Sequence, residues 1–223
     1  MKSLHRVKRF SENGGDGLVR RAPVLTRLRR LTYDPRVIAP VSTTPPEWAT
    51  AEDFLAETDS REVSPLLRVL LTSDGSMTTL LEALRGGRID LDVVRQGEEP
   101  IDDDTARRLG VPAHDPAITR HVWLTHDGRR LVYAVSVLPV ASLSPSLAEG
   151  IRRGVEPLGR LLDACGRPAV RDGLRIGRIH NTGLADALGA PSSAPLWCRR
   201  YRLAVEQVLT ASIFEVFSPR LAD

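Results

Sequence analysis

Two charged side chains stand in otherwise apolar rows of strands that the sequence predicts, and both residue types can do chemistry there. Side chains alternate between the two faces of a strand, so Glu215 in "ASIFEVFSP" shares a face with Ile213 and Phe217. In "AITRHVWL" the same alternation places Arg120 in a row with Ile118. A single buried charge is destabilising by several kcal/mol, so each of the two charges requires a partner.

The pattern alone leaves three interpretations of Arg120 and Glu215 open. The two residues could neutralise each other, or their rows could be partly exposed to solvent. Alternatively, Arg120 could hold the carboxylate of a substrate, because the planar guanidinium donates two parallel hydrogen bonds to such a group. The third interpretation indicates a pocket that recognises an organic acid.

A second group of charged residues follows in the segment "CRRYRL". Alternation places Arg200 and Arg202 on one face of a strand, and Arg199 with Tyr201 on the other. We interpret this segment as a solvated cationic strand. The start of a helix at "EPLGRLL" could present backbone N–H groups to an anion, which is a weak signal by itself.

The sequence lacks the other common catalytic motifs. His114, His121 and His126 show no metal-ligand spacing. Cys165 and Cys198 are the only cysteines, so we expect neither a metal site nor a disulfide framework. There is no glycine-rich phosphate loop, nucleophile elbow or CxxC motif. The charged residues in the strands therefore remain the candidates for chemistry.

Local patterns predict the elements that must position these candidates. Serine, proline and glycine signals predict helices at residues 65–71 and 76–84, twice within 142–163, and at 184–188. Strands are expected at residues 89–95, 117–124, 130–138, 196–205 and 207–217. Asp127-Gly128 is a hairpin signal, Pro157 is expected in the first turn of a helix, and residues 166–195 are otherwise expected to be loop-rich. Hairpins without repeated βαβ units predict an α+β fold with a single antiparallel sheet.

The composition indicates one soluble domain with an N-terminal extension. Of 223 residues, 42% are hydrophobic and 26% are charged, and no apolar run approaches the ~20 residues that span a bilayer. Residues 1–60 contain several Pro and Gly residues and show no sustained periodicity. We expect a basic, partly disordered extension at residues 1–60 and a folded domain at residues 61–223.

The distribution of charge and the small number of cysteines indicate which partners the protein binds and in which cellular compartment it lies. Residues 1–36 contain ten Lys or Arg and three Asp or Glu, and we interpret them as a solvated tail. The remaining residues carry a net negative charge, so we expect no nucleic-acid partner and no membrane association. No apolar stretch follows the basic N-terminus, and the two thiols are far apart, which predicts a cytoplasmic location.

Six segments of the sequence occur in an order and with a spacing that are specific to one protein family. They are "SDGSMTTLLEAL", "ITRHVWLTHDGRRLVYAVSVLPVASLS", "EPLGRLL", "RDGLRIGR", "LWCRRYRL" and "IFEVFSP". Arg120 precedes Pro139 by 19 residues, as the strand–turn–strand of this family requires. Across residues 63–220 the chain resembles chorismate pyruvate-lyase, also called 4-hydroxybenzoate synthase, and most of all a divergent branch with a "TSDG" segment.

The resemblance implies a fold, an activity and a ligand. The fold is a single antiparallel sheet covered by helices and closing flaps over an internal site, and it is shared with the UTRA sensor domains of GntR-type regulators. The activity is a lyase reaction that splits chorismate into 4-hydroxybenzoate and pyruvate without a metal or an organic cofactor. The implied partners are the small-molecule substrate and the aromatic acid product.

The resemblance also implies roles for four residues. Arg120 would bind the ring carboxylate, and the backbone amide of Leu158 would contribute to the same anion site. Met77 would line the pocket from the first flap. Glu215 would meet the hydroxyl group at the far end of the ring. Whether Glu215 is protonated and acts as a general acid, or is ionised, stays open, as does an intramolecular hydrogen transfer that needs no acid.

Two other functions fit the same segments. One is a non-catalytic binding domain of the UTRA type, and the other is a lyase that forms 3-hydroxybenzoate from chorismate. The chain departs from compact family members in its extension, in the longer loop "IHNTGLADALGAPSSAP", and in Gly75 and Thr78-Thr79 around Met77. The arginine-rich composition favours secondary metabolism, whereas the downstream pathway and the oligomeric state are not predicted.

Overall fold

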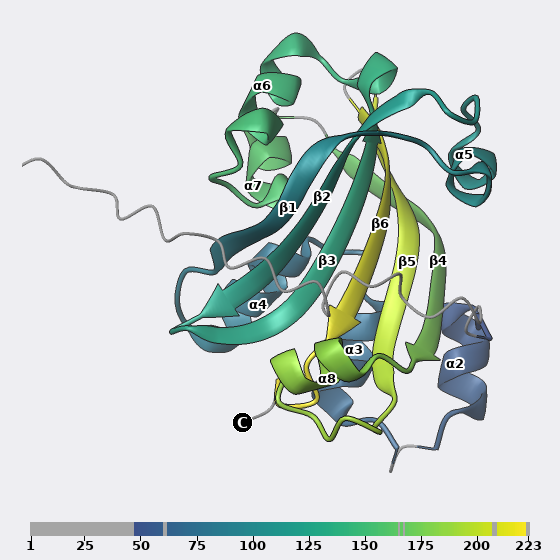
Figure 1. The fold of residues 1–223 in the computed structure, drawn as a ribbon. Helices are drawn as coiled ribbons and strands as arrows, with labels where there is room; N and C mark the ends of the chain where they lie inside the picture. Colours follow the sequence, from purple (N-terminus) through teal and green to yellow (C-terminus); the bar gives the residue numbers. More distant parts are fainter. Residues whose placement is uncertain (1–46, 60–61, 165, 167, 207–208, 222–223) are drawn as a thin grey trace, which may run out of the picture. The chain divides into compact units, whose positions relative to one another are not determined.

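One antiparallel sheet of six strands organises the structure. The computed structural model describes residues 47–59, 62–164, 166, 168–206 and 209–221. The strands are β1 (Asp90–Pro100), β2 (Pro116–His126), β3 (Arg129–Pro139), β4 (Ala169–Ile179), β5 (Leu196–Val205) and β6 (Leu209–Phe217). They lie in the order β1-β2-β3-β6-β5-β4, and every neighbouring pair is antiparallel (Figure 1). The expected α+β fold with a single antiparallel sheet is confirmed.

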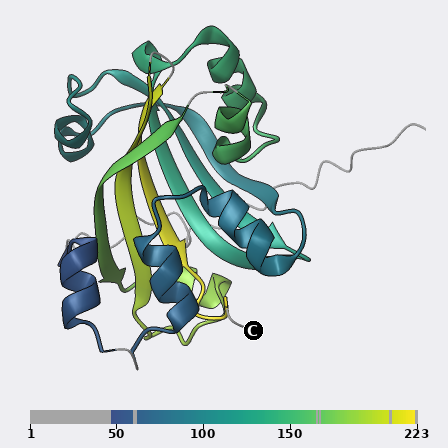
Figure 2. The ribbon, with the colours of Figure 1, turned by 180° about the vertical axis from the view of Figure 1, so that it is seen from behind.

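Seven α-helices within the described residues cover the two faces of the sheet. They are α2 (Ala51–Glu57), α3 (Pro65–Thr72), α4 (Met77–Arg85), α5 (Asp103–Leu109), α6 (Pro145–Arg153), α7 (Leu158–Asp163) and α8 (Thr182–Ala187). Seen from behind, α2, α3 and α4 lie in front of the sheet, with α8 on its other side (Figure 2). Within the described part of the chain, no helix is long and apolar enough to cross a membrane.

Two apolar clusters meet on the sheet face that carries α3 and α4. Ile213 and Phe217 project from the same face of β6, and Phe217 packs in the cluster beneath α3 and α4. Ile213 packs further along the strand, in the cluster that includes Ile151 of α6 and Leu162 of α7. Glu215 lies between Ile213 and Phe217 in the strand, so its side chain faces the boundary between these two clusters.

Local sequence signals start the helices and the first hairpin as expected. The side chains of Ser64, Ser76 and Ser144 accept hydrogen bonds from backbone N–H groups in the first turns of α3, α4 and α6. Asp127 and Gly128 form the turn between β2 and β3, with φ of 48° and 75°. The hairpin predicted from this dipeptide is therefore confirmed.

Strand β4 occupies a segment that was expected to be rich in loops. Its pairing with β5 is irregular between Asp172 and Arg175, where Gly173 has φ 62°. This bulge interrupts the alternation on which the prediction depended, so the strand escaped detection. Helix α5 was also missed, although Asp102 caps it by accepting a hydrogen bond from the Thr105 N–H.

Helix α2 lies within the segment that the sequence assigned to the N-terminal extension. A capping box starts the helix. Phe54 packs edge-on against Trp197 of β5, with ring centroids 5.3 Å apart. The backbone of Ala49 pairs with Ile176 of β4. This short segment packs on the sheet, whereas residues 1–46 of the expected extension lie outside the described residues.

Candidate active site

A pocket lies between the sheet and the first turns of α4 and α7. It holds about 580 Å³ of atom-free space, part of it open to solvent. The four residues predicted from the sequence all line this pocket: Met77, Arg120, Leu158 and Glu215. The structure brings these four residues together in one pocket, whereas the ligand contacts assigned to them stay a prediction.

The register of the sheet sets the separation of the two charged residues. Arg120 on β2 pairs with Ser136 on β3, and Glu215 on β6 pairs with Ala134, two residues before Ser136 on β3. Two strand spacings of about 4.8 Å and an offset of about 6.8 Å place their Cα atoms about 12 Å apart. Because Ala134 and Ser136 are small, they leave room above β3 for a planar ring between the two charged groups.

Arg120 is a buried cation without a carboxylate partner among the described residues. It is 2% exposed, its Nη2 donates a hydrogen bond to the Glu156 carbonyl oxygen at 3.3 Å, and its Nε has no partner. Burial lowers its pKa to about 10. An uncompensated guanidinium at a pocket wall favours binding of an anion, because the anion would supply the missing charge and hydrogen-bond acceptors.

Glu215 is 4% exposed and has a different partner from the one that the sequence suggested. The Nε of Arg199 donates to Glu215 Oε2 at 2.6 Å, and the Tyr201 hydroxyl donates to Oε1 at 3.3 Å. The interpretation of "CRRYRL" as a solvated strand is wrong for Arg199, whose side chain is 0% exposed. The pairing of Arg120 with Glu215, one of the interpretations left open, is not what the structure contains.

Arg199 fixes the carboxylate in both position and charge. Its Nη1 donates to the carbonyl oxygens of Leu70 and Ser73, both at 2.7 Å, which ties the end of α3 to the sheet. Burial alone would lower the pKa of Arg199, but Glu215 and Tyr201 outweigh this effect and the pKa is raised. The ion pair with this buried guanidinium favours the ionised form of Glu215 in the ligand-free protein.

The flap, residues 75–79 around the start of α4, packs closely against α7. Met77 and Leu158 are the first residues of these two helices, and both line the pocket. A Cβ atom at Gly159 would lie 2.9 Å from the Oγ of Ser76, the residue that caps α4. Only glycine therefore allows this approach of the two helix starts without displacement.

A Gly159→Ala substitution is expected to push the Ser76 side chain out of its capping position and to shift Met77. The lost cap should lower the free energy of unfolding by about 1 kcal/mol, and the affinity of the pocket for aromatic acids should fall with it. Thermal unfolding and isothermal titration with 4-hydroxybenzoate measure the two effects. Gly97, whose added Cβ would meet nothing within 4 Å, provides the control variant Gly97→Ala. Unchanged stability and affinity in Gly159→Ala would contradict this description of the flap.

The residues that hold Glu215 were accessible from the sequence but were not recognised. Strands β5 and β6 are antiparallel neighbours, and their register pairs Arg199 with Glu215 directly. Strand alternation then places Tyr201 on the same face as Arg199. The sequence prediction lacked the register between the last two strands, which would have indicated the pair of Arg199 and Glu215.

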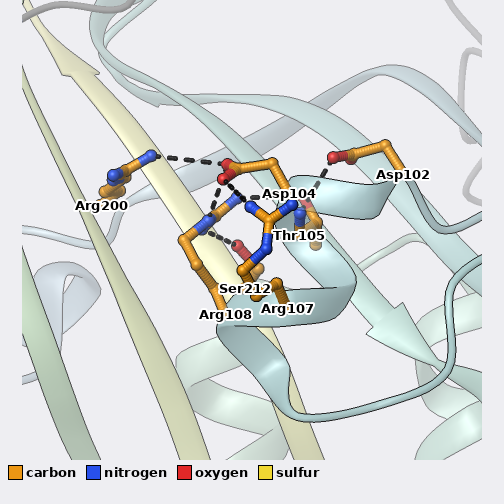
Figure 3. A network of polar contacts seen from close by, with 7 residues as sticks. All are labelled: Asp102, Asp104, Thr105, Arg107, Arg108, Arg200 and Ser212. Carbon is orange, nitrogen blue, oxygen red and sulfur yellow. Dashed lines mark hydrogen bonds and ion pairs between the residues drawn. The ribbon is translucent and has the colours of Figure 1, made fainter.

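A second polar cluster lies on the opposite face of the sheet, around α5 (Figure 3). Asp104 accepts hydrogen bonds from Arg107 and Arg108, and its Oδ2 lies 3.7 Å from Nη1 of Arg200. Arg108 also donates to Ser212 of β6 at 3.0 Å. These contacts join α5 to β5 and β6, so we interpret the cluster as structural. Across the described ranges, no group of three or more His, Cys, Asp or Glu residues could hold a metal ion.

The antiparallel sheet and its pocket with a buried cation define an α+β small-molecule-binding domain. The fold is similar to that of PhnF from Mycobacterium smegmatis, with a TM-score of 0.53 and 20% identity over 66% of this chain and 65% of PhnF, so the chain spans less than two thirds of that protein. The effector domain of PhnF matches with a TM-score of 0.52 and 20% identity over 66% of this chain and 90% of the domain. At this identity the likeness shows the fold alone.

The chain belongs to the chorismate pyruvate-lyase Rv2949c-like family, whose sequence model matches residues 71–223. A probable chorismate pyruvate-lyase from Methylococcus capsulatus is 34% identical over 144 residues, covering 63% of this chain and 88% of the relative. A probable chorismate pyruvate-lyase from Pseudomonas aeruginosa is 30% identical over 161 residues, covering 72% of this chain and 88% of the relative. The family resemblance inferred from the sequence is confirmed.

Proposed function

We propose that this chain converts chorismate into 4-hydroxybenzoate and pyruvate. One observation carries the proposal: a single pocket has a buried arginine at one end, with no carboxylate partner among the described residues, and an anchored carboxylate at the other. A six-membered ring with a carboxylate and a hydroxyl at opposite positions matches this pair of groups. Chorismate and 4-hydroxybenzoate both have that arrangement.

Four contacts orient the ring. Arg120 binds the ring carboxylate through its unpartnered N–H groups, and the backbone N–H of Leu158 adds a donor to the same group. Met77 covers the ring from the flap. Glu215, held by Arg199, accepts a hydrogen bond from the ring hydroxyl. Because Glu215 is ion-paired, it acts as an acceptor in this proposal and not as a general acid.

The bond changes are those of an elimination that aromatises the ring. The ether C–O bond to the ring breaks, and its electron pair goes to the oxygen of the departing enolpyruvate. The ring carbon that bears the hydroxyl loses a proton, and that C–H electron pair completes the aromatic ring. The proton ends on the methylene carbon of enolpyruvate, which becomes the methyl group of pyruvate. Aromatisation supplies the driving force, so the pocket mainly has to hold a reactive conformer.

Incubation of the purified protein with chorismate, followed by chromatography, tests this function. We expect 4-hydroxybenzoate and pyruvate in equal amounts, and no product above background with an Arg120→Met variant. If 3-hydroxybenzoate forms instead, the pocket orients the ring differently from the proposal. If an aromatic acid binds saturably and no chorismate is consumed, the chain is a binding domain and the lyase assignment is wrong.

A further inference from the structure

Chorismate carries two carboxylates, and the contacts described so far account for only one of them. The second belongs to the enolpyruvyl ether. A second buried or half-buried carboxylate requires its own cation or several hydrogen-bond donors. Among the described residues that line the pocket, only Arg120 and Arg171 carry a positive charge.

Arg171 is available to bind an anion. It lies on β4, is half-buried, and forms no ion pair with a carboxylate among the described residues. Its Nη1 donates to the Asp74 carbonyl oxygen at 3.1 Å, and its Nε is buried without a partner. Arg199, in contrast, already neutralises Glu215 and does not line the pocket.

Arg171 also lies at the correct end of the pocket. Burial and Glu215 raise the pKa of Tyr201, while Arg199 and Arg171 lower it, the latter through its charge and a side-chain hydrogen bond. The Tyr201 hydroxyl itself donates to Glu215. Arg171, Tyr201 and Glu215 all line the pocket, and this effect of Arg171 on the pKa of Tyr201 agrees with a guanidinium on the Tyr201 side of the pocket.

The covalent structure of chorismate agrees with this placement. Its enolpyruvyl ether is attached to the ring carbon adjacent to the one that bears the hydroxyl. A ring held with its hydroxyl at Glu215 consequently directs the enolpyruvyl carboxylate away from Arg120, towards the Tyr201 end of the pocket.

We propose that Arg171 binds the enolpyruvyl carboxylate and so selects a dianionic substrate; this inference rests on the proposed function. Arg171 would hold the leaving group while negative charge develops on its ether oxygen. The product 4-hydroxybenzoate lacks this carboxylate. Arg171 should thus contribute to binding and turnover of chorismate and little to binding of the product, whereas Arg120 should contribute to both.

An Arg171→Met variant separates these two contributions. We expect kcat/KM for chorismate to fall by about 100-fold, with the affinity for 4-hydroxybenzoate changed by less than about threefold. Arg171→Lys should recover part of the turnover, because it restores the charge without the two-pronged hydrogen bond. Arg178→Met is the matched control on the same strand: its side chain is 52% exposed, pairs with Glu62 and does not line the pocket, so its kinetics should equal those of the wild type.

Equal losses of chorismate turnover and 4-hydroxybenzoate affinity in Arg171→Met would overturn the inference, because they would indicate general damage to the pocket. Wild-type kinetics in Arg171→Met would overturn it as well. If the wild type does not consume chorismate, the proposed function fails, and calorimetric titration decides about Arg171 separately. In that case, tighter binding of chorismate than of 4-hydroxybenzoate that disappears in Arg171→Met would support the site, and equal binding would reject it.

Discussion

A Glu215→Leu variant is expected to lose about 3–5 kcal/mol of its free energy of unfolding. Arg199, fully buried with its Nε 2.6 Å from Glu215, would retain its charge without a counterion. The hydrogen bonds from Arg199 to the carbonyl oxygens of Leu70 and Ser73 prevent the guanidinium from turning towards solvent. Urea unfolding followed by far-UV circular dichroism measures the loss.

The double variant Arg199→Met/Glu215→Leu tests whether the unpaired charge is the cause. It should recover most of the lost stability, because apolar side chains can replace a buried ion pair at little cost. The exposed pair of Arg202 with Asp172, each 42% exposed and 2.6 Å apart, provides a comparison, and Asp172→Asn should change stability by less than about 1 kcal/mol. A double variant as unstable as the two single variants added together would contradict the explanation.

The buried pair also changes how an activity loss at Glu215 should be interpreted. In the structure, Glu215 neutralises Arg199, and Arg199 in turn holds the end of α3. A loss of activity in a Glu215 variant therefore combines lost substrate contact with a displaced flap, and only a variant of known stability separates the two effects.

The placement of Arg120 and Glu215 in apolar rows of their own strands was predictable because it depends on local information. A strand alternates with a period of two, and the dipeptide Asp127-Gly128 fixes the turn between β2 and β3. These two rules determine which residues share a face within each strand and how β2 and β3 pair, but not how β6 pairs with β3. The meeting of these residues with Met77 and Leu158 was implied by the family resemblance, since the packing of α4 and α7 onto the sheet is not encoded locally.

The partner of Glu215 was not found because it depends on the register between strands. Three arginines within four residues of β5 appear as a solvated patch when the strand is considered by itself. Their separation into the buried Arg199 and the more exposed Arg200 and Arg202 follows only when β5 lies against β6. The bulge in β4 had a similar effect: it broke the alternation around Arg171, so the cation proposed here for the second carboxylate lay in a segment expected to be a loop.

An Arg120→Met variant is expected to have the opposite effect on stability from Glu215→Leu. It should abolish binding of aromatic acids and raise the free energy of unfolding of the ligand-free protein by about 1–4 kcal/mol. Methionine is similar in length to the aliphatic part of the arginine side chain and has no charge to desolvate, whereas Arg120 is buried and has no carboxylate partner among the described residues. Urea unfolding without ligand and calorimetric titration with benzoate measure the two effects.

Ligand-linked unfolding shows whether Arg120 is held in a destabilising state for the sake of binding. Benzoate at 100 times its Kd should stabilise the wild type by about 2.7 kcal/mol and leave Arg120→Met unchanged. Since burial lowers the pKa of Arg120 to about 10, benzoate binding to the wild type should also weaken as the pH rises past that value, where the guanidinium loses its proton. A destabilised Arg120→Met protein would show that Arg120 is compensated within the ligand-free fold. A bound carboxylate would then not be needed to compensate the charge of Arg120. The main argument for the proposed function, an uncompensated arginine in the pocket, would fail.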